Sequence, residues 1–268
     1  MIMKRRKKNK RESLQKGIYL LPNLCTTGSL FFGFFSIIKS LNGDFVLAAW
    51  AILISGIFDM LDGRLARLTR GVSQFGVAYD SLVDLASFGL APALLIYTWS
   101  LVSLNKLGWL VAFLFFACGA LRLARYNVQS ANVELKHFQG LPIPMAAYSL
   151  ATTVIFYEHV YTIPPKNDLF ILIETVMLAL LMVSNLRYRS LKEIELKGRL
   201  PFFALVVLVA VIALLAFRPP WTLWIGTLGY VLWGVLENTF LLFRKEKKML
   251  KETKPLSIVT VDKQSKTS

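Results

Sequence analysis

Apolar residues run through this chain in windows long enough to cross a lipid bilayer. A membrane helix needs about 20 predominantly apolar residues, and eight such windows can be placed along the chain. The predicted spans are residues 20–38, 45–67, 75–101, 107–127, 142–163, 168–186, 201–217 and 222–243. We therefore expect an all-α, polytopic integral membrane protein with about eight transmembrane helices.

The composition narrows the class further. Of the 268 residues, 55% are hydrophobic and 18% are charged, below the roughly 25% charged residues usual in soluble proteins. Cys25 and Cys118 both lie in apolar windows, which argues against a disulfide framework and a thiolate metal site. The two histidines, His137 and His159, are too few and too isolated to indicate a zinc site.

The net charge of +15 is explained by topology. Lys and Arg number eight in the N-terminal arm, three in residues 64–70, three in 122–136, five in 187–199 and eight from residue 244 onward. All of these, 27 of the 31, fall on one side of the membrane. The positive-inside rule then puts both termini in the cytoplasm. Since the basic residues are not interleaved with aromatic ones, no nucleic-acid partner is expected.

The pattern divides the chain into four segments. We expect a basic cytoplasmic arm, which would also attract anionic lipids, then a membrane-embedded catalytic core, then a cytoplasmic loop with a C-terminal helix pair, and a flexible cytoplasmic tail. Their bounds are 1–17, 18–190, 191–245 and 246–268. The sequence does not indicate what the helix pair does.

Four aspartates lie inside predicted spans: Asp59, Asp62, Asp80 and Asp84. A carboxylate at the centre of a membrane helix costs roughly 2.5–3.5 kcal/mol on insertion scales, so a structural role for all four is a poor explanation. The first two are spaced i, i+3 and the last two i, i+4, on either side of a turn near 68–73. Counted from that turn, they pair at depths of ~9 and ~15 Å. The spacing predicts one pocket near the cytoplasmic face.

Clustered carboxylates repel one another unless cations bridge them. All-oxygen ligand sets suit Mg²⁺ or Mn²⁺, and four carboxylates suit a two-metal site acting on a substrate that carries phosphates. Gly63, Ala66 and Gly76 remove side-chain bulk from the two helices. Arg67 can supply a bidentate clamp to a phosphate.

These residues carry a resemblance to a known family. The pattern D59-x2-D62-G63-x2-A66-R67-x8-G76-x3-D80-x3-D84 matches the signature of the CDP-alcohol phosphatidyltransferases. Four further stretches look like the phosphatidylserine synthase branch of that family. They are LPNLCTTGSLFFGFFSI, ALRLARYNV, FQGLPIPMAA and MVSNLRYRS.

The resemblance implies a fold, a reaction and residue roles. The family has six core helices and transfers the phosphatidyl group of CDP-diacylglycerol to an alcohol, here L-serine, releasing CMP. By resemblance, Asp59, Asp62 and Asp80 hold one metal ion, Asp59, Asp80 and Asp84 help to hold a second, and Asp84 is also the general base. Gly63, Ala66, Arg67 and Gly76, with Pro22 and Asn23, lie against the CDP-lipid. The resemblance further implies a homodimer in the bacterial cytoplasmic membrane, with the site facing the cytoplasm.

The acceptor pocket is less sharply indicated. Arg122 and Arg125, spaced i, i+3 at the inner end of the fourth predicted span, are explained either by topology or by binding of the acceptor's carboxylate, with Asn127 adding a hydrogen bond. Residues 138–147 are explained equally by a helix-start turn and by a loop that closes over the acceptor.

Two alternatives stay open. The acceptor of the same reaction can be glycerol 3-phosphate or inositol phosphate, although their phosphates call for a denser basic cluster than Arg122 and Arg125. From another class, intramembrane carboxylates also mark the pathways of divalent-cation transporters. Transport gives no reason for Gly63, Arg67 or Gly76, and a path would spread the carboxylates over several depths.

Overall fold

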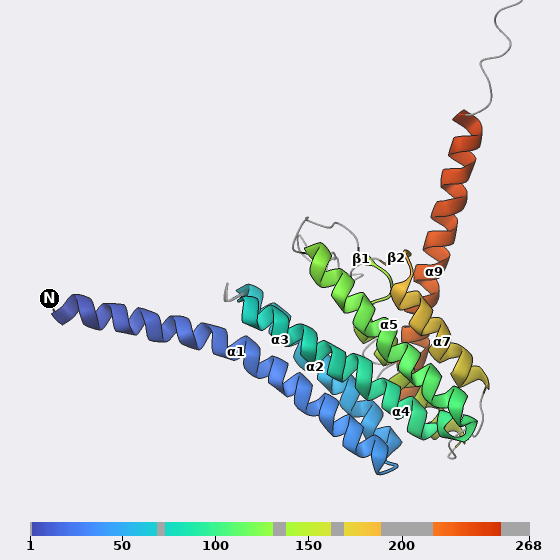
Figure 1. Ribbon diagram of the computed structural model, residues 1–268, viewed down its shortest axis with the longest axis horizontal. Coiled ribbons are helices and arrows are strands. Elements are labelled where there is room, and N and C mark those ends of the chain that lie inside the picture. Colours follow the sequence, from blue (N-terminus) through green and yellow to red (C-terminus); the bar gives the residue numbers. More distant parts are fainter. Residues whose placement is uncertain (1, 69–72, 131–137, 162–168, 189–216, 253–268) are drawn as a thin grey trace, which may run out of the picture.

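The protein is described from a computed structural model (Figure 1), which covers residues 2–68, 73–130, 138–161, 169–188 and 217–252. Within these residues it is helical apart from two strands of two residues each, which agrees with the predicted all-α class. The longer helices are α1 (Ile2–Leu41), α2 (Phe45–Leu68), α3 (Gln74–Asp84), α4 (Ala91–Trp99), α5 (Lys106–Ser130), α6 (Ile143–Tyr161), α7 (Leu169–Val183) and α9 (Pro219–Glu252).

Helices α1 and α2 form an antiparallel hairpin (Figure 1). The chain reverses at Gly43, whose φ of 81° lies in the left-handed region that glycine adopts without strain. Lys39 and Asp44 form an ion pair of 2.7 Å beside the turn. Deeper in the pair, the hydroxyls of Ser29 and Ser55 share a buried hydrogen bond of 2.8 Å. Small hydroxylated side chains let membrane helices approach closely while satisfying their own polar groups.

The third helical segment changes its pitch next to a candidate site residue. α3 starts at the N-cap Ser73, whose Oγ accepts a hydrogen bond of 2.9 Å from the Gly76 amide. A π-helical turn, Leu85–Leu90, begins directly after Asp84 and continues into α4. Such a turn holds one extra residue, which rotates the residues after it by about 100°. Ser87, inside this turn, faces α1, where its hydroxyl donates to the Ser29 carbonyl at 3.2 Å.

Helix α6 lies at the centre of the fold. Its residues from Ala146 to Phe156 are mostly buried, and it packs against α2, α4 and α9. The core also contains Ile52, Phe88 and Phe115, all with no exposed surface. α5 packs mainly on α7.

A short antiparallel ladder ties the entry of α6 to the exit of α7. Strand β1 (Phe138–Gln139) pairs with β2 (Arg187–Tyr188), with Phe138 opposite Tyr188. The Gly140 amide continues the ladder by donating to the Leu186 carbonyl at 2.8 Å. Gly140 has a φ of 82°, and a side chain there would overlap the Met182 carbonyl, so the close pairing requires glycine. The ladder brings the start of α6 beside Tyr188.

The C-terminal helix α9 packs on α6 and extends beyond the bundle, as α1 does elsewhere (Figure 1). It contains the predicted span 222–243 and continues to Glu252, so residues 246–252 of the predicted tail are helical, and the flexibility of the tail stays a prediction. The rest of the tail and the predicted span 201–217, apart from Phe217, lie outside the described residues.

Within the described ranges, four helical segments are long and apolar enough to cross a membrane: Leu21–Leu41, Phe45–Leu68, Gln74–Trp99 and Lys106–Gln129. They agree with the first four predicted spans, although α1 itself begins earlier, at Ile2. α6 and α7 coincide with the fifth and sixth predicted spans, although α7 has only 15 residues. The total of eight spans stays a prediction.

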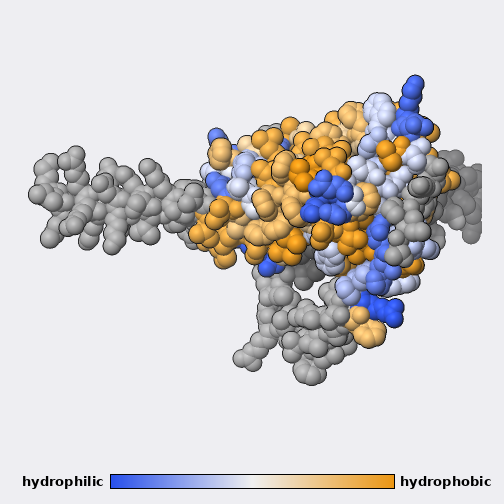
Figure 2. All heavy atoms as spheres, turned by 90° about the horizontal axis from the view of Figure 1, so that it is seen from below, coloured by the Kyte–Doolittle hydropathy of each residue, from blue (hydrophilic) through white to orange (hydrophobic). Residues whose placement is uncertain are grey.

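The outer surface fits a lipid environment. Figure 2 shows a broad apolar face on the described residues, interrupted by a few polar side chains. Large side chains such as Leu24 (68% exposed), Phe31 (62%) and Trp233 (68%) point outward. Exposed apolar surface on this scale marks contact with lipid or another apolar partner. The chain is therefore an integral membrane protein.

Candidate active site

The predicted aspartate pocket exists as a physical cluster. Asp59 and Asp62 lie in the last three turns of α2, and Asp80 lies in α3. Each offers a carboxylate oxygen, and these oxygens all lie within 4.8 Å of one another. Asp62 is buried, with 6% of its surface exposed. The separation suits carboxylates that share a cation.

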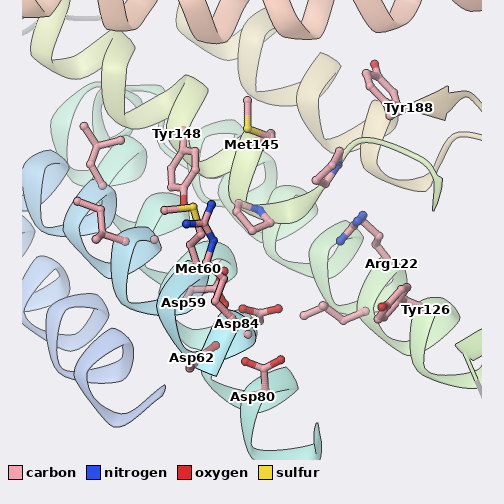
Figure 3. A pocket seen from close by; sticks show the side chains of 18 of the residues that line it. Asp59, Met60, Asp62, Asp80, Asp84, Arg122, Tyr126, Met145, Tyr148 and Tyr188 are labelled. Atoms are coloured by element: carbon pink, nitrogen blue, oxygen red, sulfur yellow. The ribbon is translucent and has the colours of Figure 1, made fainter. Parts of the chain in front are cut away.

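Asp84 belongs to the same group. It is the last residue of α3, and its side chain lies beside that of Asp59 (Figure 3). Two oxygens of the cluster, Asp62 Oδ2 and Asp84 Oδ1, are buried with no hydrogen-bond partner among the described residues. A buried carboxylate oxygen without a partner is costly. A divalent cation would satisfy these oxygens, so the donor set fits Mg²⁺ or Mn²⁺.

The four aspartates line one cavity of about 720 Å³ (Figure 3). Its walls come from α2, α3, α5, α6, β2 and α9. We call the part around Asp59, Asp62, Asp80 and Asp84 the aspartate end. Arg122 lies across the cavity from it, and we call the part around Arg122, Tyr188 and Tyr230 the arginine end. A cavity of this size accommodates a ligand of several hundred daltons.

The residues predicted to face a CDP-lipid gather near the aspartate end. Gly63 and Arg67 line the cavity, and a side chain at Gly63 would meet nothing within 4 Å. Arg67 is exposed, and its Nε donates to the Gly63 carbonyl at 2.9 Å. Gly76 lies close to Asn23, since an added Cβ would be 3.5 Å from Asn23 Oδ1. Ala66 lies on α2 but is not part of the cavity lining.

The predicted acceptor group separates in the structure. Arg122 lines the cavity, is 8% exposed, and its Nε is buried without a hydrogen-bond partner among the described residues. Arg125 instead turns toward the end of α7, where Nη1 donates to the Val183 carbonyl at 3.1 Å. Asn127 pairs with Ser81, its Nδ2 donating to Oγ at 3.1 Å. Neither Arg125 nor Asn127 lines the cavity.

Four tyrosines that the sequence analysis missed also line the cavity: Tyr126, Tyr148, Tyr188 and Tyr230. Tyr126 was within reach of prediction, because it follows Arg122 by one helical turn. Tyr148 enters because Gly56 leaves room for it, and a side chain at Gly56 would overlap the Tyr148 hydroxyl. Tyr188 and Tyr230 come from β2 and α9 and have no local signal in the sequence.

Of the two explanations offered for residues 138–147, the helix start is confirmed, and a loop that closes over the acceptor stays a prediction. α6 begins at Ile143, with Pro144 in its first turn, as expected for a helix start. Pro142, Pro144 and Met145 also line the cavity, so the same segment forms part of its wall.

Two glutamates outside this cavity make structural contacts. Glu158 accepts a hydrogen bond of 2.7 Å from Trp99 Nε1 and does not line the cavity. The sequence analysis considered only the four aspartates, although Glu174 in α7 and Glu237 in α9 also lie within predicted spans. Glu174 accepts a hydrogen bond of 2.8 Å from the Thr153 hydroxyl, so its position in the bundle is explained by helix packing.

Comparison with known proteins agrees with this geometry. Residues 19–184 match the family model of CDP-alcohol phosphatidyltransferase. The chain is 36% identical to a CDP-diacylglycerol–serine O-phosphatidyltransferase of Helicobacter pylori, over 85% of this chain and 94% of the relative. It is 33% identical to the Bacillus subtilis protein of the same name, over 65% of this chain and 92% of the relative.

Another relative is named for a different lipid product. The chain is 37% identical to an archaetidylserine synthase of Methanothermobacter thermautotrophicus, over 63% of this chain and 69% of the relative. The family match covers more than half of the chain and includes all four aspartates of the cavity. This chain belongs to the CDP-alcohol phosphatidyltransferase family.

Proposed function

We propose that this protein transfers the phosphatidyl group of CDP-diacylglycerol to the hydroxyl of L-serine, giving phosphatidylserine and CMP. The observation that supports the proposal most directly is the distribution of charge in one cavity, which has four carboxylates at one end and a buried arginine at the other. Relatives named for this reaction support the choice of serine.

The aspartate end is suited to a metal-bound nucleotide. Asp59, Asp62, Asp80 and Asp84 would hold Mg²⁺ or Mn²⁺, in the two-ion arrangement implied by the family resemblance. When bound, the ions neutralise the diphosphate and the charge that develops on the departing CMP. Arg67 would bind a substrate phosphate, while Gly63 and Gly76, with Ala66 and Asn23 nearby, leave space for the cytidine diphosphate.

The transfer itself needs a base and an aligned acceptor. The serine oxygen forms a bond to the phosphorus that bears the diacylglycerol, and the bond from that phosphorus to the CMP oxygen breaks. The serine hydroxyl proton passes to Asp84, which we assign as the general base. A carboxylate is a weak base toward an alcohol, but it is effective when the proton moves late in the transition state.

Arg122 suits the serine carboxylate. Its guanidinium is largely buried, and a guanidinium matches a carboxylate through two parallel hydrogen bonds. We do not carry Arg125 and Asn127 into this role, because their side chains are paired elsewhere. Among the described residues that line the cavity, the other arginines are Arg64 and Arg67, on the last turns of α2, which disfavours a phosphorylated acceptor at the arginine end.

The location follows from the charge distribution. We propose that the cavity opens to the cytoplasm of a bacterial cell and that the protein acts in the cytoplasmic membrane as a homodimer. The excess of Lys and Arg on one side of the spans supports this orientation.

Purified protein with CDP-diacylglycerol, Mg²⁺ or Mn²⁺ and labelled serine tests the proposal through CMP release. We expect CMP and labelled lipid to appear together, in an ion-dependent manner. CMP release with glycerol 3-phosphate but not with serine would show that the acceptor is wrong. If no alcohol supports CMP release, the enzyme proposal fails and cation transport becomes the better hypothesis.

The base is tested by Asp84→Asn. We expect turnover to fall by about 10²–10⁴-fold, the usual contribution of a general base, while binding of the CDP-lipid is retained. Normal turnover in this variant would remove Asp84 from the role.

A further inference from the structure

We infer that helix α9 is a wall of the acceptor site that determines acceptor selectivity, by holding Tyr188 and Tyr230 beside Arg122. The inference rests on the proposed function, since it names the part of the same cavity that recognises the alcohol. The supporting observations are the docking of α9, the seat that it makes for Tyr188, and the position of both rings in the cavity lining.

Polar and aromatic contacts fix the rotation of α9 on the core. Thr227 and Thr152 of α6 share a hydrogen bond of 2.8 Å. Trp224 Nε1 donates to the Thr153 hydroxyl at 3.1 Å, and the same ring stacks on Phe156 at 4.3 Å between centroids with planes 8° apart. Hydrogen bonds between membrane helices specify orientation because the alternative leaves polar groups in lipid.

With this rotation fixed, the next residues on the same face meet the cavity. Tyr230 and Gly234 follow Thr227 by three and seven positions, so they share its side of the helix. Gly234 is buried, whereas Gly226 and Gly229 are exposed. Tyr230 lines the cavity.

Gly234 forms a seat for Tyr188. A Cβ at Gly234 would overlap the Tyr188 ring, whereas a Cβ at Gly226 or Gly229 would meet nothing within 4 Å. Tyr188 is 2% exposed and lies 6.0 Å from the Tyr230 ring, between centroids. On its other side the β1–β2 ladder fixes its backbone opposite Phe138. The ring is therefore held between the ladder and α9.

The result is a small, aromatic compartment around one buried cation. Tyr188 lies on the Arg122 side of the cavity, away from the aspartates (Figure 3). Rigid rings limit the space beside the guanidinium and keep it poorly hydrated, which strengthens its pairing with a carboxylate. Such a compartment favours a compact amino acid over a larger acceptor. Tyr188 and Tyr230 act here as positioning and size-limiting residues.

Gly234→Leu tests the seat, with Gly226→Leu as the matched control on the same helix. In Gly234→Leu the new side chain displaces Tyr188, and we expect the KM for serine to rise about tenfold or more. The KM for CDP-diacylglycerol and the Mn²⁺ activation midpoint should stay within twofold of wild type. Gly226→Leu should leave all three unchanged. Parallel changes in both substrates' KM values, or unchanged serine KM, would overturn the inference.

Tyr230→Ala provides a second test of the inference, which can be used if Gly234→Leu does not fold. Removing the ring enlarges the compartment, so we expect weaker use of serine together with a gain in the ratio of homoserine to serine turnover. An unchanged ratio and unchanged serine KM would overturn the inference. If wild type uses glycerol 3-phosphate instead of serine, the proposed acceptor is wrong, while a selective change in the KM for glycerol 3-phosphate still supports the role of α9.

Discussion

The aspartate end and the arginine end of the cavity differ in how the chain builds them. Asp59 and Asp84 are the limits of 26 consecutive residues on two neighbouring helices. The arginine end combines Arg122 of α5, Tyr188 of β2 and Tyr230 of α9, which meet only because α6 and the β1–β2 ladder hold three distant segments together. The first end therefore depends on local spacing and the second on tertiary packing.

The two ends also differ in charge and in the chemistry that each can perform. Four carboxylates are suited to holding cations that would neutralise the charge developing during the reaction, so their loss should lower kcat. One buried guanidinium among aromatic rings is suited to recognising a small anion, so its loss should raise the KM for the acceptor. If the two ends have these separate roles, variants at the aspartate end should change mainly kcat, and variants at the arginine end should change mainly the KM for the acceptor.

The largest effect should follow a change at the aspartate end. In Asp80→Asn we expect kcat to fall by about 10²–10³-fold, the usual cost of losing one electrostatic contact to the reacting group. The measurement is CMP release over a range of Mn²⁺ concentrations.

The matched control is Asp44→Asn, the same chemical change in the turn between α1 and α2. Asp44 forms an ion pair with Lys39 at the turn before α2, and exposed pairs contribute only about 0–1 kcal/mol. Its turnover should equal that of wild type. A wild-type kcat and Mn²⁺ midpoint in Asp80→Asn would show that this carboxylate takes no part.

An intermediate effect is expected at the arginine end, where two arginines one helical turn apart can be compared. Arg122→Gln should raise the KM for serine about 10–100-fold, because a charge-assisted hydrogen bond contributes about 1.5–3 kcal/mol. The KM for CDP-diacylglycerol should change little.

Arg125→Gln should leave the KM for serine within twofold of wild type. It removes the hydrogen bond to the Val183 carbonyl at the end of α7, so the expected change is a lower thermal unfolding temperature in detergent. An equal rise in the KM for serine in both variants would contradict the assignment of acceptor binding to Arg122 alone.

The same division explains how much was predictable from the sequence. Apolar windows were enough to locate α2 and α5. Asp59 and Asp62, like Asp80 and Asp84, are about one helical turn apart, so the 3.6-residue repeat of a helix was enough to place each pair on one face. The i, i+3 spacing likewise grouped Arg122 with Arg125. Helix spacing does not determine the direction of a long, flexible side chain, which depends on the hydrogen-bond acceptors around it. For Arg125 the acceptor is a carbonyl of another helix.

The remaining features depend on contacts that no short pattern encodes. Tyr230 reaches the cavity because α9 docks on α6 with one face, and Gly234 matters only because Tyr188 lies against it. Ser87 bonds to α1 from within the π-helical turn after Asp84, and nothing in the apolar pattern indicates an extra residue in that turn. Such features require the tertiary structure.

The smallest expected effect concerns the docking of α9 itself. The hydroxyls of Thr152 and Thr227 share a hydrogen bond between α6 and α9, and bonds of this kind in membrane proteins average about 0.6 kcal/mol. In a double-mutant cycle of Thr152→Val and Thr227→Val, we expect each single variant to lower the unfolding free energy, measured by titration with SDS in mixed micelles. The double variant should lose less than the sum of the two, by a coupling of about 0.6 kcal/mol. The KM for serine should rise by less than about threefold, since the contacts of Trp224 remain. Full additivity would mean that the two hydroxyls do not hold α9, and the arginine end would then depend on aromatic packing alone.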